Sequence, residues 1–289
     1  MTQKGVSPYL SNAVASTTKI VRANNHRSVA NDAVIVETPL QIQLQQLDRK
    51  IPIATIMRTP GDDRSLALGF VFAENIIKQG SDVTSIGSEQ ENEIILTIAA
   101  DIPVDIQALS RPFVSYSGCG ICGKTTLKQL ALQQHRAIDE SKHWLPFDSL
   151  LEHASLLSSH QQLFQKTGGV HGAALLQRQD NTLVLLDCKE DVGRHNAVDK
   201  LVGKHLLSTL PTHNVLLLSG RISFELVQKA VMAGISVIAA IGAPSSLAIQ
   251  TAKQFNLTLI GFMQTSQANI YCGDWRLQEN SQEFSNDNI

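Results

Sequence analysis

Two cysteines three positions apart mark the segment of this chain in which chemistry is most expected. Cys119 and Cys122 lie in the loop 117–124, where glycines stand next to both of them. The chain has only four cysteines in 289 residues, which argues against a disulfide scaffold and for a reducing compartment. In that setting a Cys-x-x-Cys pair serves as a metal clip, a redox pair or a sulfur nucleophile. The other two, Cys188 and Cys272, stand alone and are expected to be buried as small apolar side chains.

The cysteine loop also matches a phosphate-binding pattern. Residues 118–125 satisfy G-x-x-x-x-G-K-[ST], the P-loop signature. A P-loop needs a buried parallel strand directly before it, whereas the approach here, 112–116, is short and begins at a proline. The strand 183–187 ends in an aspartate as a magnesium-binding strand does, but it is predicted to pair in a hairpin. A nucleotide-binding protein or NTPase that uses Lys124 and Thr125 is therefore kept as an alternative.

A zinc site would use Cys119 and Cys122 as one half and His171 or Cys188 as the other. A structural zinc site usually has four protein ligands, and the chain has no second Cys-x-x-Cys and no His-x-x-x-His. A zinc nucleobase deaminase needs His-x-Glu ahead of Pro-Cys-x-x-Cys. Here the cysteines precede the histidine and Ala173 occupies the position of the acid, so no metal site is predicted and deamination is chemically unsupported.

Sulfur chemistry on a thiolate fits the loop best. A helix is predicted from Thr125 to about Arg136, and its N-terminus together with Lys124 would lower the pKa of a nearby thiol. A redox pair is usually held rigidly in a compact βαβ unit, which this loop lacks. The interleaved glycines instead leave the sulfur open to partners, so the loop favours a sulfur carrier over an oxidoreductase.

Composition places the chain among globular proteins of a reducing compartment. It is 43% hydrophobic and 17% charged, with a net charge of −2, so no electrostatic attraction to nucleic acid is expected. The longest apolar stretch, 235–243, is far shorter than the ~20 residues that span a bilayer, and the start of the chain lacks an export signal. A cytoplasmic protein without membrane or nucleic-acid partners is predicted.

The elements expected around the loop indicate an α/β protein. Short strands surround one helix in the first half, with strands at 33–36 and 93–98 and a helix after the turn 60–63. A helix at 148–166 and a hairpin of strands 170–176 and 183–187 follow. Helices and apolar strands then alternate, which predicts βαβ crossovers in a parallel or mixed sheet covered on both faces. The predicted units are a loose tail 1–32, a β-rich α+β part 33–112, the cysteine loop and its helix 113–136, an α/β/α domain 137–275 and a polar tail 276–289.

In such a sheet the loops that leave the carboxyl ends of the strands hold ligands. Loops 219–223 and 242–246 and the segment after Phe262 combine glycines, serines and Arg221, which predicts a phosphate-rich ligand. The alternative is that Ser223, Ser245 and Ser246 are ordinary helix caps.

The polar cluster 190–196 precedes a helix and is a further candidate. The competing interpretation is a solvated helix start whose acidic residues face the helix dipole, with Lys200 as surface charge. His171, at the start of a strand and flanked by small residues, is interpreted as a hydrogen-bonded structural residue more readily than as a ligand.

Several segments taken together resemble the FdhD family, the formate dehydrogenase accessory sulfurtransferases, and the resemblance runs from about residue 33 to residue 271. The matching segments are MRTPGDD (57–63), LGF (68–70), SGCGICG (117–123), TGGVHGAA (167–174), EDVGRHNAVDK (190–200), SGRIS (219–223), GAPSS (242–246) and LIGF (259–262).

This resemblance implies a sulfurtransferase that takes persulfide sulfur from a cysteine desulfurase. It would pass the sulfur to the molybdenum of a bis-molybdopterin guanine dinucleotide cofactor before insertion into formate dehydrogenase. The fold implied is a cytidine-deaminase-like three-layer α/β/α domain with a smaller β-rich N-terminal part, usually as a homodimer. Cys119 would carry the persulfide and Cys122 would assist. A cofactor chaperone without sulfur chemistry is the remaining alternative.

The resemblance also implies which residues hold the guanine dinucleotide ends, a site that GDP-like ligands would mimic. They are Arg194, His195, Ser219, Gly220, Arg221, Ser223, Gly242, Ser245, Ser246, Phe262, Met263, Gln264, Thr265, Ser266 and Gln267. One departure from the family concerns the segment 263–268, where glycine and arginine are expected after the Gly-Phe pair. Without that positive charge, binding of the pyrophosphate here depends on amides and hydroxyls.

Overall fold

A six-stranded mixed sheet forms the centre of the C-terminal part of the protein. The computed structural model describes residues 12–23, 26–103, 113–114, 136–206 and 212–278. The strand order of this sheet is β13-β12-β11-β10-β8-β9. The strands are β8 (His171–Gln179), β9 (Thr182–Asp191), β10 (Asn214–Leu218), β11 (Val237–Ala240), β12 (Thr258–Gly261) and β13 (Asn269–Cys272). The strands β10, β11 and β12 run parallel, and the other three pair antiparallel with their neighbours. The predicted mixed sheet and the predicted β8–β9 hairpin are both confirmed.

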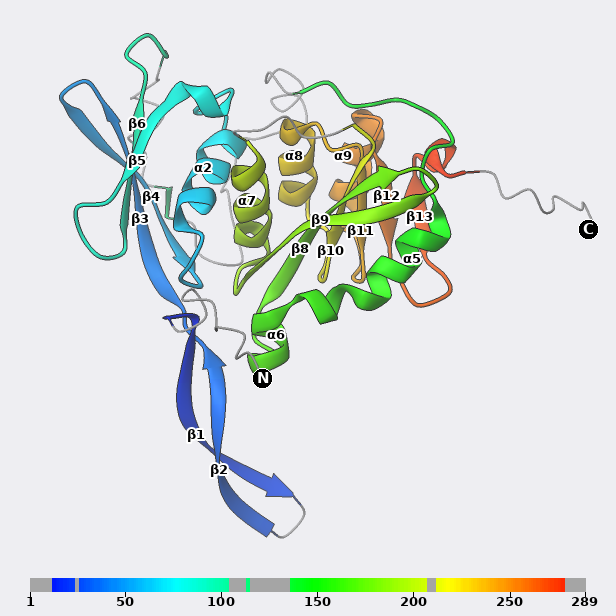
Figure 1. Cartoon of the computed structure of the whole chain (residues 1–289), viewed down its shortest axis with the longest axis horizontal. Helices are drawn as coiled ribbons and strands as arrows, with labels where there is room; N and C mark the ends of the chain where they lie inside the picture. Colours follow the sequence, from blue (N-terminus) through cyan, green and yellow to red (C-terminus); the bar gives the residue numbers. More distant parts are fainter. Residues whose placement is uncertain (1–11, 24–25, 104–112, 115–135, 207–211, 279–289) are drawn as a thin grey trace, which may run out of the picture.

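Helices cover both faces of this sheet (Figure 1). One face is covered by α7 (Arg194–His205), α8 (Phe224–Ala233) and α9 (Ser246–Gln254), and the other by α5 (Phe147–Leu156) and α6 (Gln162–Thr167). Alternate residues of the four inner strands, β8, β10, β11 and β12, enter two different cores. Leu216 and Leu218 of β10 face the first core, whereas Val215 and Leu217 face the second. The three-layer α/β/α arrangement follows from this alternation.

The β-rich N-terminal part is a five-stranded sheet of order β5-β6-β3-β4-β7. Its strands are β3 (Thr38–Gln46), β4 (Arg49–Arg58), β5 (Val83–Gly87), β6 (Glu93–Ile98) and β7 (Phe113–Val114), and it also contains η1 (Gly80–Asp82). The helix α2 (Asp63–Ala73) lies between this sheet and α7 (Figure 1). Because α2 is covered on both sides, every residue from Leu66 to Ala73 is buried. The two predicted units therefore share one continuous core.

Two glycines allow α2 and α7 to pack at very short range. A Cβ atom on Gly69 would lie 2.0 Å from the carbonyl oxygen of Asp199, and one on Gly203 would lie 1.9 Å from the carbonyl oxygen of Ser65. Real Cβ atoms do not approach backbone this closely, so any larger residue would push the helices apart. This contact explains why a Leu-Gly-Phe segment stands in the middle of α2.

The segment predicted to be a loose tail contains two paired strands, so that prediction is wrong for residues 14–23 and 26–32. The strands β1 (Val14–Ala23) and β2 (His26–Ile35) pair antiparallel as a separate two-stranded sheet. Its base packs against α6, where Ala13 joins Leu163 and Val170 in a small apolar cluster. The hairpin buries little else, so its sequence lacks the strong apolar pattern from which strands are predicted.

Two further boundaries differ from prediction. The helix expected at 148–166 is interrupted by η2 (Leu157–His160), where the Ser159 hydroxyl donates to the carbonyl of Leu156. The polar tail expected from residue 276 starts later, because η3 (Asp274–Arg276) belongs to the fold and the Arg276 side chain is fully buried. Arg276 donates to the carbonyl of Asp139 and to Thr258.

Among the described residues, no helix is both long enough and apolar enough to cross a bilayer. The predicted helix 125–136 lies almost entirely outside the described residues, and so do Cys119 and Cys122.

Candidate functional site

The three loops predicted to hold a ligand meet at one edge of the six-stranded sheet. The carboxyl ends of β10, β11 and β12 lie side by side, and backbone hydrogen bonds join the loops that leave them. Gly242 N donates to the carbonyl of Gly220 at 3.2 Å, and Phe262 N donates to the carbonyl of Gly242 at 3.1 Å. The contact between these loops produces a surface of loop backbone at a strand edge where α/β proteins commonly bind ligands.

Gly242 is required by the packing of the loops on one another. A Cβ atom at this position would lie 2.7 Å from the backbone nitrogen of Arg221 and 2.7 Å from the carbonyl of Gly220. The glycine therefore sets how closely the loops after β10 and β11 approach. Its role here is to allow close backbone contact between the loops, because a glycine has no side chain that would separate them.

The serines of these loops have different partners. The hydroxyl of Ser219 accepts a hydrogen bond from Gly172 N at 2.8 Å, which ties the end of β10 to the start of β8. Ser245 caps α9, since its hydroxyl accepts from Ala248 N at 3.2 Å, so the helix-cap interpretation is correct for this residue. Ser223 precedes α8 without capping it and contacts His195 instead. Ser246 is exposed at the start of α9.

His195 is held by two groups on the neighbouring helix. Its Nε2 lies 3.0 Å from the Ser223 hydroxyl and 3.0 Å from Oε2 of Glu225. Burial lowers its pKa to about 3, with further lowering by the charges of Lys229 and Arg194, so the ring is neutral at pH 7. A neutral ring beside a carboxylate carries its proton on Nε2, which leaves Nδ1 as an acceptor. Glu225 is a site residue that sequence reasoning missed, because nothing in its spacing marks it.

Two arginines create positive surroundings around a second histidine at the same edge. His171 lies against Gly220, since a Cβ atom on that glycine would be 3.1 Å from its Nδ1. Burial lowers the pKa of His171, and the nearby charges of Arg194 and Arg221 lower it further. The Nε of Arg194 is buried and has no hydrogen-bond partner among the described residues. A buried guanidinium nitrogen without a partner beside a second arginine is an arrangement suited to an anion.

The segment after β12 is only partly available to a ligand. Phe262 is 48% exposed and adopts a left-handed backbone conformation with φ 53°. The Met263 side chain turns into the second core and is 4% exposed, so it does not face the site. Gln264 and Gln267 close a turn on each other, with Gln264 N donating to the Gln267 carbonyl at 2.9 Å. Thr265 and Ser266 are exposed on this turn.

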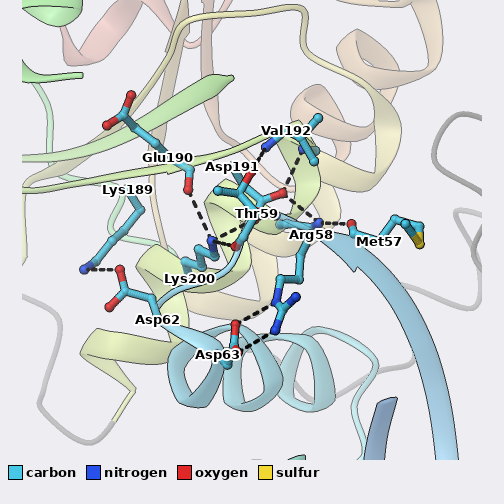
Figure 2. Close-up of polar contacts among 12 residues, drawn as sticks. Met57, Arg58, Thr59, Asp62, Asp63, Lys189, Glu190, Asp191, Val192 and Lys200 are labelled. Carbon is cyan, nitrogen blue, oxygen red and sulfur yellow. Dashed lines mark hydrogen bonds and ion pairs between the residues drawn. The ribbon is translucent and has the colours of Figure 1, made fainter. Parts of the chain in front are cut away.

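The acidic part of the cluster 190–196 is structural (Figure 2). The Asp191 carboxylate is fully buried and accepts hydrogen bonds from Thr59 N, Gly193 N and the Asn196 side chain. Lys200 is also buried, with its Nζ 2.7 Å from Oδ2 of Asp191 and 2.8 Å from the Thr59 carbonyl. The interpretations of Lys200 as surface charge and of this segment as a solvated helix start are therefore wrong.

Glu190 caps the short helix α6, because its carboxylate accepts from Leu163 N at 2.9 Å and from Phe164 N at 2.8 Å. The segment 57–63 is held by a contact within itself and by a contact from β9. Arg58 makes a bidentate contact with Asp63, and Lys189 pairs with Asp62 at 2.9 Å (Figure 2). Both long polar motifs thus join the two sheets, and only Arg194 and His195 of the second motif reach the ligand edge.

The two single cysteines have no activated thiol. Burial raises the pKa of Cys188 to about 12, helped by Glu190 and Asp187, and burial also raises the pKa of Cys272. Each is only partly buried, which is less than the burial expected, and packs against one of the cores. Asp187, the residue that could mimic a magnesium-binding aspartate, is paired with Lys204 at 2.8 Å and lies in a hairpin strand. Within the described ranges, no group of three or more His, Cys, Asp or Glu residues is placed to hold a metal ion.

Comparisons with known proteins agree with this architecture. The FdhD/NarQ family model matches residues 35–278. The chain is 40% identical over 279 residues to the sulfur carrier protein FdhD of Streptomyces avermitilis, covering 91% of this chain and 96% of the relative. It is 37% identical over 247 residues to the sulfur carrier protein FdhD of Picrophilus torridus, covering 85% and 92%.

A solved structure has the same fold. A putative formate dehydrogenase accessory protein from Desulfotalea psychrophila superposes with a TM-score of 0.71 at 24% identity, over 92% of this chain and 99% of that chain. The family match covers both sheets and every loop of the ligand edge. This chain therefore belongs to the FdhD/NarQ family.

Proposed function

We propose that this protein is a sulfur carrier that serves a formate dehydrogenase. Cys119 would receive persulfide sulfur from a cysteine desulfurase and pass it to the molybdenum of bis-molybdopterin guanine dinucleotide before the cofactor is inserted. The main support is the match over nearly the whole chain to relatives named sulfur carrier proteins, together with a Cys-x-x-Cys loop that stands within the matched residues.

The sulfur would move by thiol–disulfide chemistry. The Cys119 thiolate attacks the outer sulfur of the donor persulfide, the sulfur–sulfur bond of the donor breaks, and the donor cysteine leaves as a thiolate. Cys119 then holds the sulfur as a persulfide, and Cys122 assists or receives it. Lys124 and the predicted helix after it would favour the thiolate form.

The ligand edge would bind the guanine dinucleotide ends of the cofactor. Arg194 and Arg221 supply positive charge, and the Arg194 Nε still lacks a partner among the described residues. The exposed turn 264–267 and Phe262 border the same loops. The hydroxyls of Ser219 and Ser245 already have backbone partners, so we assign phosphate contact to the two arginines and the loop amides ahead of these serines. GDP would occupy the same place.

A cytoplasmic location and a pair of copies as the working unit complete the proposal. The cofactor chaperone alternative shares the ligand edge but makes the cysteines dispensable. The NTPase alternative requires magnesium-dependent hydrolysis that depends on Lys124.

The deciding experiment is replacement of Cys119. Formate dehydrogenase produced with the Cys119→Ala protein as the only carrier should be inactive, while Cys188→Ala, which removes a thiol without activation, should support full activity. Mass spectrometry after incubation with desulfurase and cysteine should show an adduct of about 32 Da, one sulfur atom, on the peptide containing Cys119. Full enzyme activity with Cys119→Ala would exclude the carrier role and leave the chaperone.

A further inference from the structure

The hairpin of β1 and β2, called the arm below, extends away from the rest of the molecule (Figure 1). Its strands pair from Val14 with Ile35 to Ala23 with His26 and join no other sheet in the described structure. Only the base is anchored, through the small cluster around Ala13. A two-stranded ribbon is marginally stable by itself in water, so an arm of this length is expected to gain a further contact.

One face of the arm combines exposed apolar and cationic side chains. Ile20 lies opposite Val29, and the two are 57% and 69% exposed. Two positions farther along the same face, Arg22 lies directly opposite Arg27. Like charges in a cross-strand pair destabilise a sheet, so this pair calls for an anionic partner. The one ion pair of the described arm, Lys19 with Asp32, lies on the other face and leaves both arginines unneutralised.

The sequence contains a segment of complementary character. Residues 279–289, called the acidic segment below, contain Glu279, Glu283 and Asp287, no lysine or arginine, and the apolar residues Phe284 and Ile289. The arm carries three basic residues against one acid, a charge of +2, and the acidic segment carries −3, which leaves −1 for the rest of a chain with net charge −2.

Two of the three acidic residues in another exposed acidic turn already have partners. In the turn 88–93, Glu89 contacts Lys50 and Glu93 accepts a hydrogen bond from Gln43 at 2.6 Å. On charge, the acidic segment is therefore a better partner for the arm than the turn 88–93.

Geometry places this contact between two copies. The acidic segment begins after Gln278, whose backbone nitrogen donates to the carbonyl of Leu145 at 3.0 Å. The end of the described ribbon lies beside β13, on the side of the molecule opposite the arm (Figure 1). We propose that the arm of one copy binds the acidic segment of a second copy along the face of Ile20, Val29, Arg22 and Arg27. Reciprocal contacts of this kind close a two-fold dimer. Nearly all of the arm and the whole acidic segment lie outside the family match at 35–278, so the contact is independent of the sulfur-transfer proposal.

Photo-crosslinking in the full-length protein tests the contact directly. A benzophenone amino acid at Val29, in a mixture of copies with natural and heavy nitrogen, should give crosslinked peptides of mixed isotope that contain residues 279–289. Leu47, which is 71% exposed in the turn between β3 and β4, provides the matched control. Crosslinks no stronger than those from Leu47, crosslinks within one copy, or crosslinks from Val29 to another region would each overturn the proposal.

Charge reversal tests the same contact by sedimentation. Arg22→Glu with Arg27→Glu should weaken association roughly tenfold or more, because exposed ion pairs are lost in both reciprocal contacts. Adding Glu279→Lys, Glu283→Lys and Asp287→Lys should restore association. The swap of Lys19→Asp with Asp32→Lys alters the other face at constant charge and should have no effect. A protein that stays monomeric, or charge reversals that fail to compensate one another, would contradict the contact.

Discussion

The Nζ of Lys200 lies 2.7 Å from Oδ2 of Asp191, and both side chains are buried. The pair connects the second turn of α7 with the end of β9, and the same carboxylate accepts a hydrogen bond from Thr59 N in the segment after β4. One ion pair therefore joins the two sheets directly below the start of α7, where Arg194 and His195 lie. The position of the candidate ligand edge depends on this buried junction.

Removing one partner of this pair should be strongly destabilising. Lys200→Met leaves an unpaired buried carboxylate and should lower the free energy of unfolding by about 3–5 kcal/mol. On the same helix, Lys204 pairs with Asp187 at 2.8 Å but is 49% exposed, so Lys204→Met should cost less than about 1 kcal/mol. Urea denaturation of the two variants measures the difference. Equal costs would show that the buried junction does not hold the two sheets together.

The close glycine contact between α2 and α7 predicts that alanine destabilises the fold, whereas helix propensity alone predicts that alanine stabilises it. Alanine in a helix interior is normally favoured over glycine by about 1 kcal/mol. At Gly203 the added Cβ would meet the Ser65 carbonyl at 1.9 Å, so Gly203→Ala should instead destabilise by about 1–3 kcal/mol or more. Gly87→Ala, with nothing within 4 Å of the added atom, is the control. Thermal unfolding compares them, and a stabilised Gly203→Ala would mean that the helices do not pack this closely.

Periodic apolar patterns predicted the regular part of the fold. Strands such as β10, whose residues are all buried, and helices such as α8 produce strong signals because each buries a continuous apolar face. The arm does not, because its side chains are mostly exposed and its stability comes from pairing and from one small cluster at its base. The break after α5 was also missed, since Ser158 and Ser159 do not interrupt a helix strongly enough to be recognised from sequence.

At the site, sequence indicated which loops leave the carboxyl ends of the strands but not what each polar side chain does. Loop convergence follows from strand order, which the alternation of helices and strands indicates. Asp191 and Lys200 pair with each other, and both also bond to Thr59, more than 130 residues away. These contacts are not visible in the sequence, so it does not distinguish a structural pair from a catalytic pair. Met263 likewise stands in a loop motif, yet its side chain lies in the core because the chain turns inward after Phe262.

The protonation of His195 gives a pH-dependent prediction. Its pKa is lowered from 6.5 to about 3 in the folded protein, so the unfolded chain binds more protons between these values. The stability that depends on the neutral ring is fully present above pH 6.5 and is lost as the pH falls toward 3. NMR titration should show a neutral ring at pH 5, and His195→Gln should make unfolding less sensitive to acid. His160 is exposed, so His160→Gln is the matched control and should leave the acid sensitivity of unfolding unchanged. An imidazole of His195 that titrates near pH 6.5 would contradict the burial described here.

Arg221 and Ser245 separate ligand binding from helix capping at the same edge. Arg221 is exposed beside the loops, so Arg221→Ala should lower the affinity for GDP by about tenfold or more, the effect of losing a hydrogen bond to a charged group, and should reduce the salt dependence of binding. Ser245 caps α9, so Ser245→Ala should lower the free energy of unfolding by about 1 kcal/mol and leave GDP affinity nearly unchanged. Isothermal titration and urea denaturation of both variants distinguish the two roles. If Ser245→Ala weakens GDP binding while Arg221→Ala does not, the phosphates contact the cap of α9 and the charge of the edge is not what holds them.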